Sequence, residues 1–227
     1  MGGSSAHARS SGRAEVGSRI GTRELTSQTN LVPFIARWSG ERNLPMPVVA
    51  RGGQWTGIAY ADRRAFDRDA NGVLWVRAVS RQGMGRPEYG KVHSQRQRLC
   101  MERLLCQICG GPADRTAEGT LWLIDAHARS LLLMGEITTH PPVCLPCAHR
   151  SVRACPHLRP EWVALRVRTA IPYGVNGILY QPADPAPVTV TAADVPFHSA
   201  RIPWVLASQL IMRISDFTVV NLEELQP

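Results

Sequence analysis

The chain has 227 residues, of which 44% are hydrophobic, and it carries a formal net charge of +8. This length suits one domain with extensions or two small domains, and no run of about 18 apolar residues occurs, so we expect no membrane-spanning helix. No apolar segment follows the early arginines, so we expect no signal peptide and a cytoplasmic protein with reduced cysteines. All but one of the 26 basic residues are arginine, which matches phosphate geometry better than lysine does and is consistent with a nucleic-acid partner.

The first half of the chain begins with a polar extension and continues as predicted strands. Residues 1–30 are rich in Ser, Gly, Arg and Thr and have no apolar period, so we expect this segment to be disordered. Residues 31–92 form a predicted β-rich region, in which Gly57–Tyr60 and Val73–Val79 have the composition of strands. The dipeptide Asn71-Gly72 is typical of a tight turn before the second of these strands.

The central region, residues 93–158, is predicted to hold two helices around one strand. Ser94–Leu105 has an imperfect apolar face, with Ser94 as the expected N-cap. Leu121–Ile124 is apolar enough for a buried strand, and Ala148–Ala154 reads as a second helix. Arginines give both helices a basic surface, so we predict that nucleic acid contacts Arg96, Arg98, Arg103, Arg150 and Arg153.

The C-terminal region, residues 159–227, is predicted to be α+β. Glu161–Thr169 alternates between apolar and charged residues, which predicts a half-buried strand with Arg166 and Arg168 on its outer face. Pro203 is suited to the first turn of a helix. The following apolar residues recur at helical spacing, which predicts an amphipathic helix, and Asp216–Leu222 is predicted as a last strand. The residues on the expected apolar face are Trp204, Ala207, Leu210, Ile211 and Ile214.

Two Cys-x-x-Cys pairs are the strongest chemical signal in the chain. Cys106 and Cys109 form the first pair, Cys144 and Cys147 form the second, and 34 residues lie between the pairs. Each such turn points two thiolates at one ion, and two turns complete a tetrahedral shell. A shell of four protein ligands leaves no position for a catalytic water, so the spacing predicts a structural Zn²⁺.

The order of elements around these cysteines resembles a treble-clef zinc finger. Glycine follows the first pair directly, as in a zinc knuckle, and the second pair opens a predicted helix. The resemblance covers roughly residues 100–158. It implies an α+β fold in which a treble-clef-like module of four cysteines is embedded among mixed β-strands and short helices.

Within the treble-clef group, the chain is similar to HNH nucleases. Many of these carry two Cys-x-x-Cys pairs that bracket an Asp-His motif, and Asp125-Ala126-His127 lies between the pairs here. The resemblance implies His127 as the base that activates water, with Asp125 and His149 as its companions. The sequence departs from the family motif because Ala126 separates the Asp from the His, and Ser130 stands where the family has proline.

A second resemblance lies around the second cysteine pair. The segments 140–148 (HPPVCLPCA) and 151–158 (SVRACPHL) are similar to a group of uncharacterised proteins common in GC-rich bacteria. The likeness extends from about Val32 to the C-terminus. It implies no activity, and it lowers the expectation of a known enzyme.

These observations predict a zinc-stabilised cytosolic binding protein whose arginine-rich helices contact nucleic acid. One alternative is the HNH-like nuclease. The other is a protein–protein adaptor in which the predicted helix around Trp204 docks a partner. The sequence holds no phosphate-binding glycine loop or other catalytic signature, so we expect no small-molecule substrate and favour a protein that is not an enzyme.

Overall fold

The computed structural model describes residues 1–2, 31–44, 47–52, 56–125, 136–156, 158 and 162–225. The disorder predicted for the N-terminal segment falls almost entirely outside this range. The described elements are mostly strands with two α-helices, which confirms the mixed α+β class. The helices are α1 (Ser94–Arg103), α2 (Leu145–Ala154) and the 3₁₀ turns η3 (Ile202–Trp204) and η4 (Leu222–Glu224). The strands are β1 (Ala36–Trp38), β2 (Val48–Arg51), β3 (Gly57–Tyr60), β4 (Leu74–Trp75), β5 (Pro87–Val92), β6 (Arg115–Thr116), β7 (Gly119–Asp125), β8 (Glu136–Thr138), β9 (Trp162–Gln181), β10 (Val188–Pro196) and β11 (Val205–Val220).

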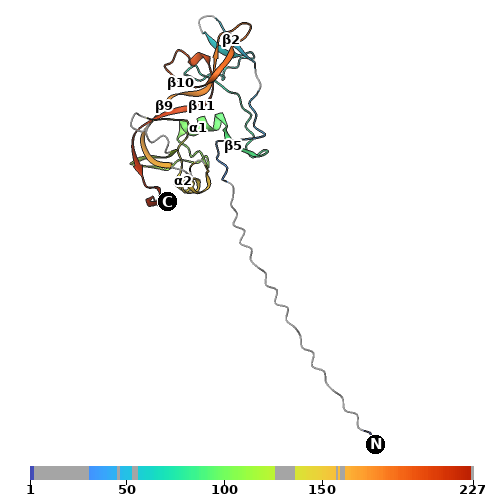
Figure 1. The fold of residues 1–227 in the computed structure, drawn as a ribbon, viewed down its shortest axis with the longest axis vertical. Coiled ribbons are helices and arrows are strands. Elements are labelled where there is room, and N and C mark those ends of the chain that lie inside the picture. The colour runs from blue at the N-terminus through green and yellow to red at the C-terminus, as the bar shows by residue number, and fades with distance from the viewer. Residues whose placement is uncertain are drawn as a thin grey trace.

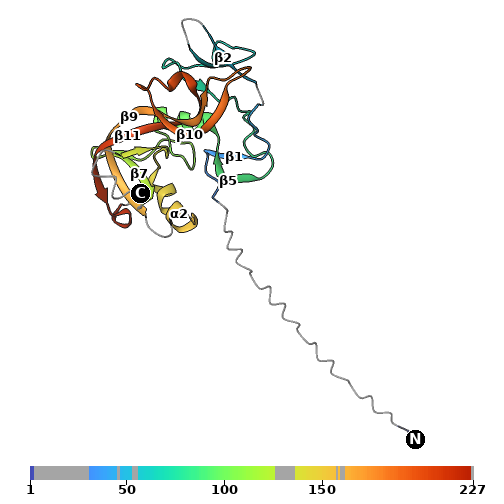
Figure 2. The ribbon, with the colours of Figure 1, turned by 45° about the horizontal axis from the view of Figure 1, so that its top comes forward.

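The centre of the fold is an antiparallel ribbon made by the two longest strands, β9 and β11. Their pairing runs from Val205 opposite Leu179 to Val220 opposite Ala164. Both strands are rich in β-branched residues, which suit an extended backbone. The main sheet has the order β4-β11-β9-β7-β6, with β10 added to β9 and β8 added to β11. Figures 1 and 2 show the ribbon curving between the end of the molecule that carries β2 and the end that carries α2.

Each end of this ribbon has its own hydrophobic core. At the end near β10, the buried cluster includes Val73, Trp75, Val175, Val195, Val205 and Leu210. At the other end both faces of the β7–β9 pair are covered. One face contributes Trp122, Ile124, Val163, Leu165 and Val167, which cluster with Ile214 of β11. The opposite face packs against α2 and two of the cysteines through Leu121, Leu123, Val143, Leu145 and Ala164.

Helix α1 lies against the ribbon and ties it to the central region. Its side toward the protein buries Ser94, Arg96, Gln97, Cys100 and Met101. The Gln97 amide donates to the carbonyl of Leu210 over 2.9 Å and accepts from the N–H of the same residue over 2.9 Å. The helix begins at Ser94, as expected. Its N-cap, however, is His93 rather than Ser94, and the His93 side chain makes no capping hydrogen bond.

The predicted C-terminal amphipathic helix is wrong, because residues 205–220 form strand β11. The register of β11 on β9 shifts between Ala207 and Gln209, where Ser208 is the extra residue. This β-bulge reverses the alternation of buried side chains, from Val205 and Ala207 before it to Leu210 after it. The three-residue step from Ala207 to Leu210 imitates helical spacing. An adaptor function based on a helix around Trp204 therefore has no structural basis.

The predicted outer face of the 161–169 strand also needs correction. Arg166 is buried and forms an ion pair with Asp114, whereas Arg168 is exposed and lies 2.8 Å from Asp216. The reason is that β9 is covered on both faces at this point, so a residue on either face is enclosed. The strand is therefore more deeply buried than a simple alternation implies.

Candidate metal centre

The first cysteine pair sits in a tight turn directly after α1. Leu104 ends the helix in the left-handed region, with φ of 51°, and this turns the chain toward Cys106. The N–H of Cys106 donates to the carbonyl of Gly111 over 2.7 Å, and the N–H of Gly110 donates to the carbonyl of Cys106 over 2.8 Å. Gly110 has φ of +75°, a conformation that glycine adopts without strain. The turn thus holds Cys106 and Cys109 on one side of the backbone.

The second pair is carried by the first turn of α2. Cys144 is the N-cap, and the N–H of Ala148 donates to its carbonyl over 2.9 Å, so Cys147 lies one turn further along the same helix. The helix begins at Leu145, earlier than predicted, because Pro146 is suited to a first helical turn. Both cysteines are therefore fixed by helix geometry rather than by a loop.

The four sulfur atoms converge on one point. They all lie within 4.8 Å of one another, and the Sγ atoms of Cys109 and Cys144 are 3.8 Å apart. A tetrahedral zinc ion with Zn–S distances of about 2.3 Å requires S–S separations of about 3.8 Å. The donor set therefore fits a tetrahedral thiophilic metal, and the predicted clustering of the four cysteines is confirmed.

The electrostatics of the cluster favour a bound cation. Burial raises the pKa of Cys106 to about 11, and burial together with the neighbouring sulfurs raises the pKa of Cys147. Burial acts in the same direction on Cys109, but the N–H of Gly111 and the surrounding sulfurs hydrogen-bond its thiolate and lower its pKa. Four thiolates crowded together repel one another unless a cation neutralises them, so metal binding and thiol deprotonation are coupled here.

The N-terminal segment is fastened onto this turn. The N–H groups of Phe34 and Ile35 donate to the carbonyls of Ile108 and Gln107 over 2.8 and 3.2 Å. The Phe34 ring lies over Gly110, so closely that a Cβ added to Gly110 would stand 2.9 Å from the ring. The cysteine turn is therefore a point where distant segments meet.

Gly110→Ala is expected to destabilise the fold more than Gly72→Ala does. Both glycines have nearly the same φ, +75° and +76°, but a Cβ on Gly72 would meet nothing within 4 Å. Gly72→Ala therefore measures the backbone penalty alone, about 1 kcal/mol. Gly110→Ala must also displace the Phe34 ring, which we expect to cost about 1–3 kcal/mol of additional stability. Urea unfolding of both variants checks this, and equal losses would contradict it.

Arg96 does not belong to an exposed basic surface, which corrects the prediction for this residue. Its guanidinium is buried and donates to both carboxylate oxygens of Glu41 over 2.6 and 2.7 Å. It also donates to the carbonyls of Phe34 and Ala36 over 2.6 and 2.8 Å. Arg96 therefore anchors the N-terminal segment to α1, because its Nε, Nη1 and Nη2 atoms all donate to residues 34–41.

The other predicted arginines lie at or near the surface. Arg98 is partly exposed and pairs with Glu102 over 3.2 Å. Arg103, Arg150 and Arg153 are exposed, and among the described residues no carboxylate pairs with them. Arg103 ends α1 just before Cys106, and Arg150 follows Cys147 by one helical turn. Arg103 and Arg150 therefore lie three residues from Cys106 and Cys147 along the chain, without a carboxylate partner in the part of the chain that the structure describes.

The residues of the nuclease hypothesis are not assembled from what is described. His127 lies outside the described residues, and so does the side chain of Asp125, whose backbone ends β7. The Nε2 atom of His149 lies 3.3 Å from the carbonyl of Leu225, so this ring contacts the C-terminal segment. A catalytic role for these residues stays a prediction.

Comparisons with known proteins add no assignment: no family model matches the chain, and no curated protein or solved structure matches it. None of the described helices is long and apolar enough to cross a membrane.

Besides the cysteine cluster, the structure contains a cavity of about 380 Å³ beside α1, which the sequence did not predict. Phe66 stands at this cavity and is fully exposed. A signal was present in the sequence, because Phe66 is the lone aromatic residue in a run of charged residues from Asp62 to Asp69. An aromatic residue in such a run has no apolar neighbours with which to form a core, so exposure was the natural expectation.

Proposed function

We propose that the four cysteines bind one structural Zn²⁺ and that the chain is a zinc-stabilised binding protein. The observation that carries this proposal is the convergence of four sulfurs within 4.8 Å from two separate elements. When bound, zinc would neutralise the thiolates and form four coordinate bonds, with no open coordination position. The role of the metal would therefore be architectural.

The order of the elements that carry the four cysteines supports a treble-clef-like module around the metal. A cysteine turn is followed by the β6–β7 hairpin and then by α2, whose first turn brings the second pair. Segment 141–143 completes the arrangement: the N–H of Val143 donates to the carbonyl of Leu121 over 2.9 Å, and its carbonyl accepts from the N–H of Asp114 over 3.0 Å. This order is the one that the resemblance to treble-clef fingers implies.

Metal analysis of the purified protein tests the proposal. We expect one zinc per chain, and we expect a chelator to remove it while exposing four additional thiols to a thiol reagent. Absence of zinc, with thiol reactivity unchanged by chelator, would overturn it.

We further propose nucleic acid as the partner, contacted through Arg103, Arg150 and Arg153. The support is their exposure beside the metal centre without a carboxylate partner among the described residues, together with the net charge of +8. Free guanidinium groups bind phosphates by pairs of parallel hydrogen bonds, and each phosphate contact makes binding more dependent on salt. Zinc would hold the two helices that carry these arginines in a fixed relation.

Replacing Arg150 and Arg153 together by alanine is expected to weaken nucleic-acid binding by about tenfold or more and to lower the salt slope by about two, one per phosphate contact. Arg201→Ala is the matched control, since Arg201 is exposed at η3, which is packed at the other end of the ribbon. Fluorescence anisotropy with labelled DNA and RNA at several salt concentrations measures both effects. Equal affinity of the double variant and the control would contradict this assignment.

A further inference from the structure

The cavity of about 380 Å³ lies between α1, strand β4 and the loop that follows β3. The residues that line it include the less exposed Trp75, Val76 and Leu99. Its more exposed rim carries Phe66, Arg64, Arg98 and Glu102. This volume falls within the range of sites that enclose one small molecule or one chemical group of a larger one. The cavity is separate from the four cysteines, none of which lines it.

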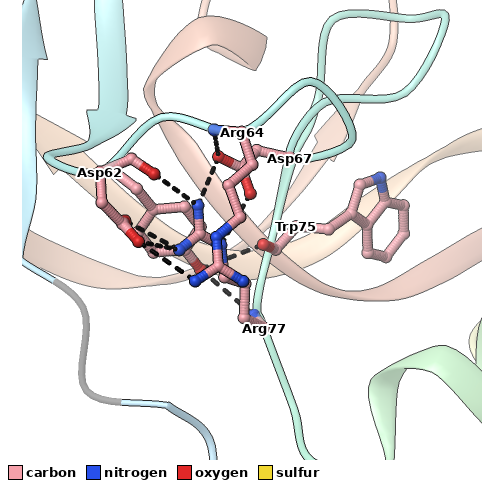
Figure 3. A network of polar contacts seen from close by, with 6 residues as sticks. Asp62, Arg64, Asp67, Trp75 and Arg77 are labelled. Atoms are coloured by element: carbon pink, nitrogen blue, oxygen red, sulfur yellow. Dashed lines mark hydrogen bonds and ion pairs between the residues drawn. The ribbon is translucent and has the colours of Figure 1, made fainter.

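One wall of the cavity is held rigid by an internal ion-pair network. Figure 3 shows Arg77 between the carboxylates of Asp62 and Asp67, with the Trp75 ring directed away from this network. The guanidinium donates to Asp67 over 2.6 and 2.7 Å and to Asp62 over 2.8 and 2.9 Å. It also lies 4.3 Å from the centre of the Tyr60 ring. Arg77 is therefore fully engaged and serves to fix the wall rather than to contact a ligand.

The rim, in contrast, carries groups that are free to exchange partners. Phe66 is 97% exposed, so its ring presents a complete face to solvent. The Arg64 side chain is 61% exposed and only 3.3 Å from Asp62, and the Arg98 side chain is 35% exposed with its partner Glu102 at 48%. Exposed ion pairs of this kind contribute little to stability, so a phosphate can replace the carboxylate at small cost. The Arg98 guanidinium lies 4.7 Å from the centre of the Trp75 ring, and both residues line the cavity.

From this arrangement we infer that the cavity binds single-stranded nucleic acid, with one unpaired base stacked on Phe66 and the adjoining phosphates on Arg64 and Arg98. An exposed aromatic ring beside arginines is the combination by which proteins hold unpaired bases without reading their sequence. A paired base offers no free face to Phe66, and the cavity has room for about one base, so a duplex is excluded from it. This inference rests on the proposed nucleic-acid function and adds a second contact region and a preference for single strands.

The test compares Phe66→Ala with Tyr89→Ala, a change of another exposed aromatic residue that does not line the cavity. Labelled oligo(dT), oligo(U) and a duplex are titrated with the zinc-loaded full chain and with each variant, followed by fluorescence anisotropy. We expect Phe66→Ala to weaken single-strand binding by about 5- to 100-fold, which corresponds to the loss of one stacked base. Duplex affinity, and all affinities of Tyr89→Ala, should stay within about twofold of the parent protein. Both aromatic side chains are exposed and contribute little to the core, so both variants should fold normally.

Arg64→Ala and Arg98→Gln give a second readout. Each is expected to lower the salt slope for the single strand by about 0.7, the value for one phosphate contact on a flexible strand. Arg201→Ala should leave that slope unchanged.

The outcomes separate this inference from the proposed function. If the parent protein binds nucleic acid but Phe66→Ala behaves like Tyr89→Ala, the inference is overturned and the Arg103, Arg150 and Arg153 surface stands. If the parent protein binds no nucleic acid, both proposals fail. A mononucleotide that binds as tightly as the oligonucleotide would show that a free nucleotide is the ligand. If polyglutamate competes as well as the oligonucleotide, the site binds polyanions through charge alone. Either of these two results would overturn the single-strand assignment.

Discussion

Cys106→Ser is expected to leave the half of the molecule around α2 without a stable fold at room temperature. A structural zinc site supplies about 10–16 kcal/mol of apparent binding free energy in small zinc domains, which matches or exceeds the total stability of a typical domain. Serine is a poor zinc ligand at neutral pH, so the shell would open and most of this contribution would be lost. The remaining sulfurs would then face one another without a cation.

The effect should spread beyond the cysteines, because the turn around Cys106 joins several segments. Phe34 and Ile35 hydrogen-bond to it from the N-terminal side, and the N–H of Gln107 donates to the carbonyl of Pro142 over 3.0 Å. Loss of the turn therefore releases contacts with both of these segments. Cys155→Ser is the matched control, since Cys155 is a partly exposed cysteine that does not belong to the cluster.

Zinc content, far-UV circular dichroism and thermal unfolding of the two variants give the answer. We expect Cys155→Ser to retain one zinc and the parent melting curve. Cys106→Ser should lose zinc and a large part of its cooperative transition, and chelator should do the same to the parent protein. A Cys106→Ser variant that melts like Cys155→Ser would show that the cluster does not carry the stability of this half.

The cysteine cluster could be predicted from the sequence because it depends on local spacing. Each Cys-x-x-Cys pair fixes its own turn, and Gly110 and Pro146 mark the two turns with residues suited to them. The strands 57–60 and 121–124 could be recognised for the same reason, since their apolar runs are short and bounded by clear turn signals.

The errors arose where distant parts of the chain decide the outcome. The spacing from Ala207 to Leu210 is helical on its face, but pairing with β9 and the bulge at Ser208 impose a strand. Arg96 and Arg166 stand at positions that the sequence pattern assigns to the surface. Their burial depends on ion pairs with Glu41 and Asp114, respectively, each of which lies about 50 residues away along the chain. Single-sequence patterns contain no information on such partners, so a buried arginine looks the same as an exposed one.

Glu41→Gln is expected to destabilise the protein by about 3 kcal/mol at neutral pH. Burial alone would raise the pKa of Glu41, but the hydrogen bonds from Arg96 and from the N–H groups of Trp38 and Arg81 outweigh it and lower that pKa to about 2. Compared with the ordinary value of 4.5, this shift corresponds to about 3 kcal/mol that favour the folded state. The same figure is expected from leaving the Arg96 guanidinium buried without its counter-charge.

The contribution of Glu41 to stability depends on pH. Since the folded pKa is below the unfolded one, the stabilisation is complete above pH 4.5 and disappears as the pH falls toward 2, where the folded carboxylate also takes up a proton. His93 lies 3.9 Å from Glu41, and its pKa is lowered by burial and by Arg96, so its protonation already destabilises the fold below its ordinary value of 6.5. The Glu41 carboxylate partly offsets this lowering, so in Glu41→Gln the pKa of His93 falls further and its protonation costs more stability below pH 6.5.

The difference in unfolding free energy between the parent protein and Glu41→Gln should therefore be at least as large at pH 5 as at pH 7, because His93 is harder to protonate without Glu41, and it should shrink below about pH 5 as Glu41 itself takes up a proton. Glu118→Gln, a change of an exposed carboxylate, is the control and should differ from the parent by less than about 0.5 kcal/mol. Denaturant unfolding at a series of pH values measures all three proteins. A difference that persists unchanged to pH 2 would mean that the amide disrupts packing rather than charge, because only the lost ion pair vanishes when Glu41 is protonated.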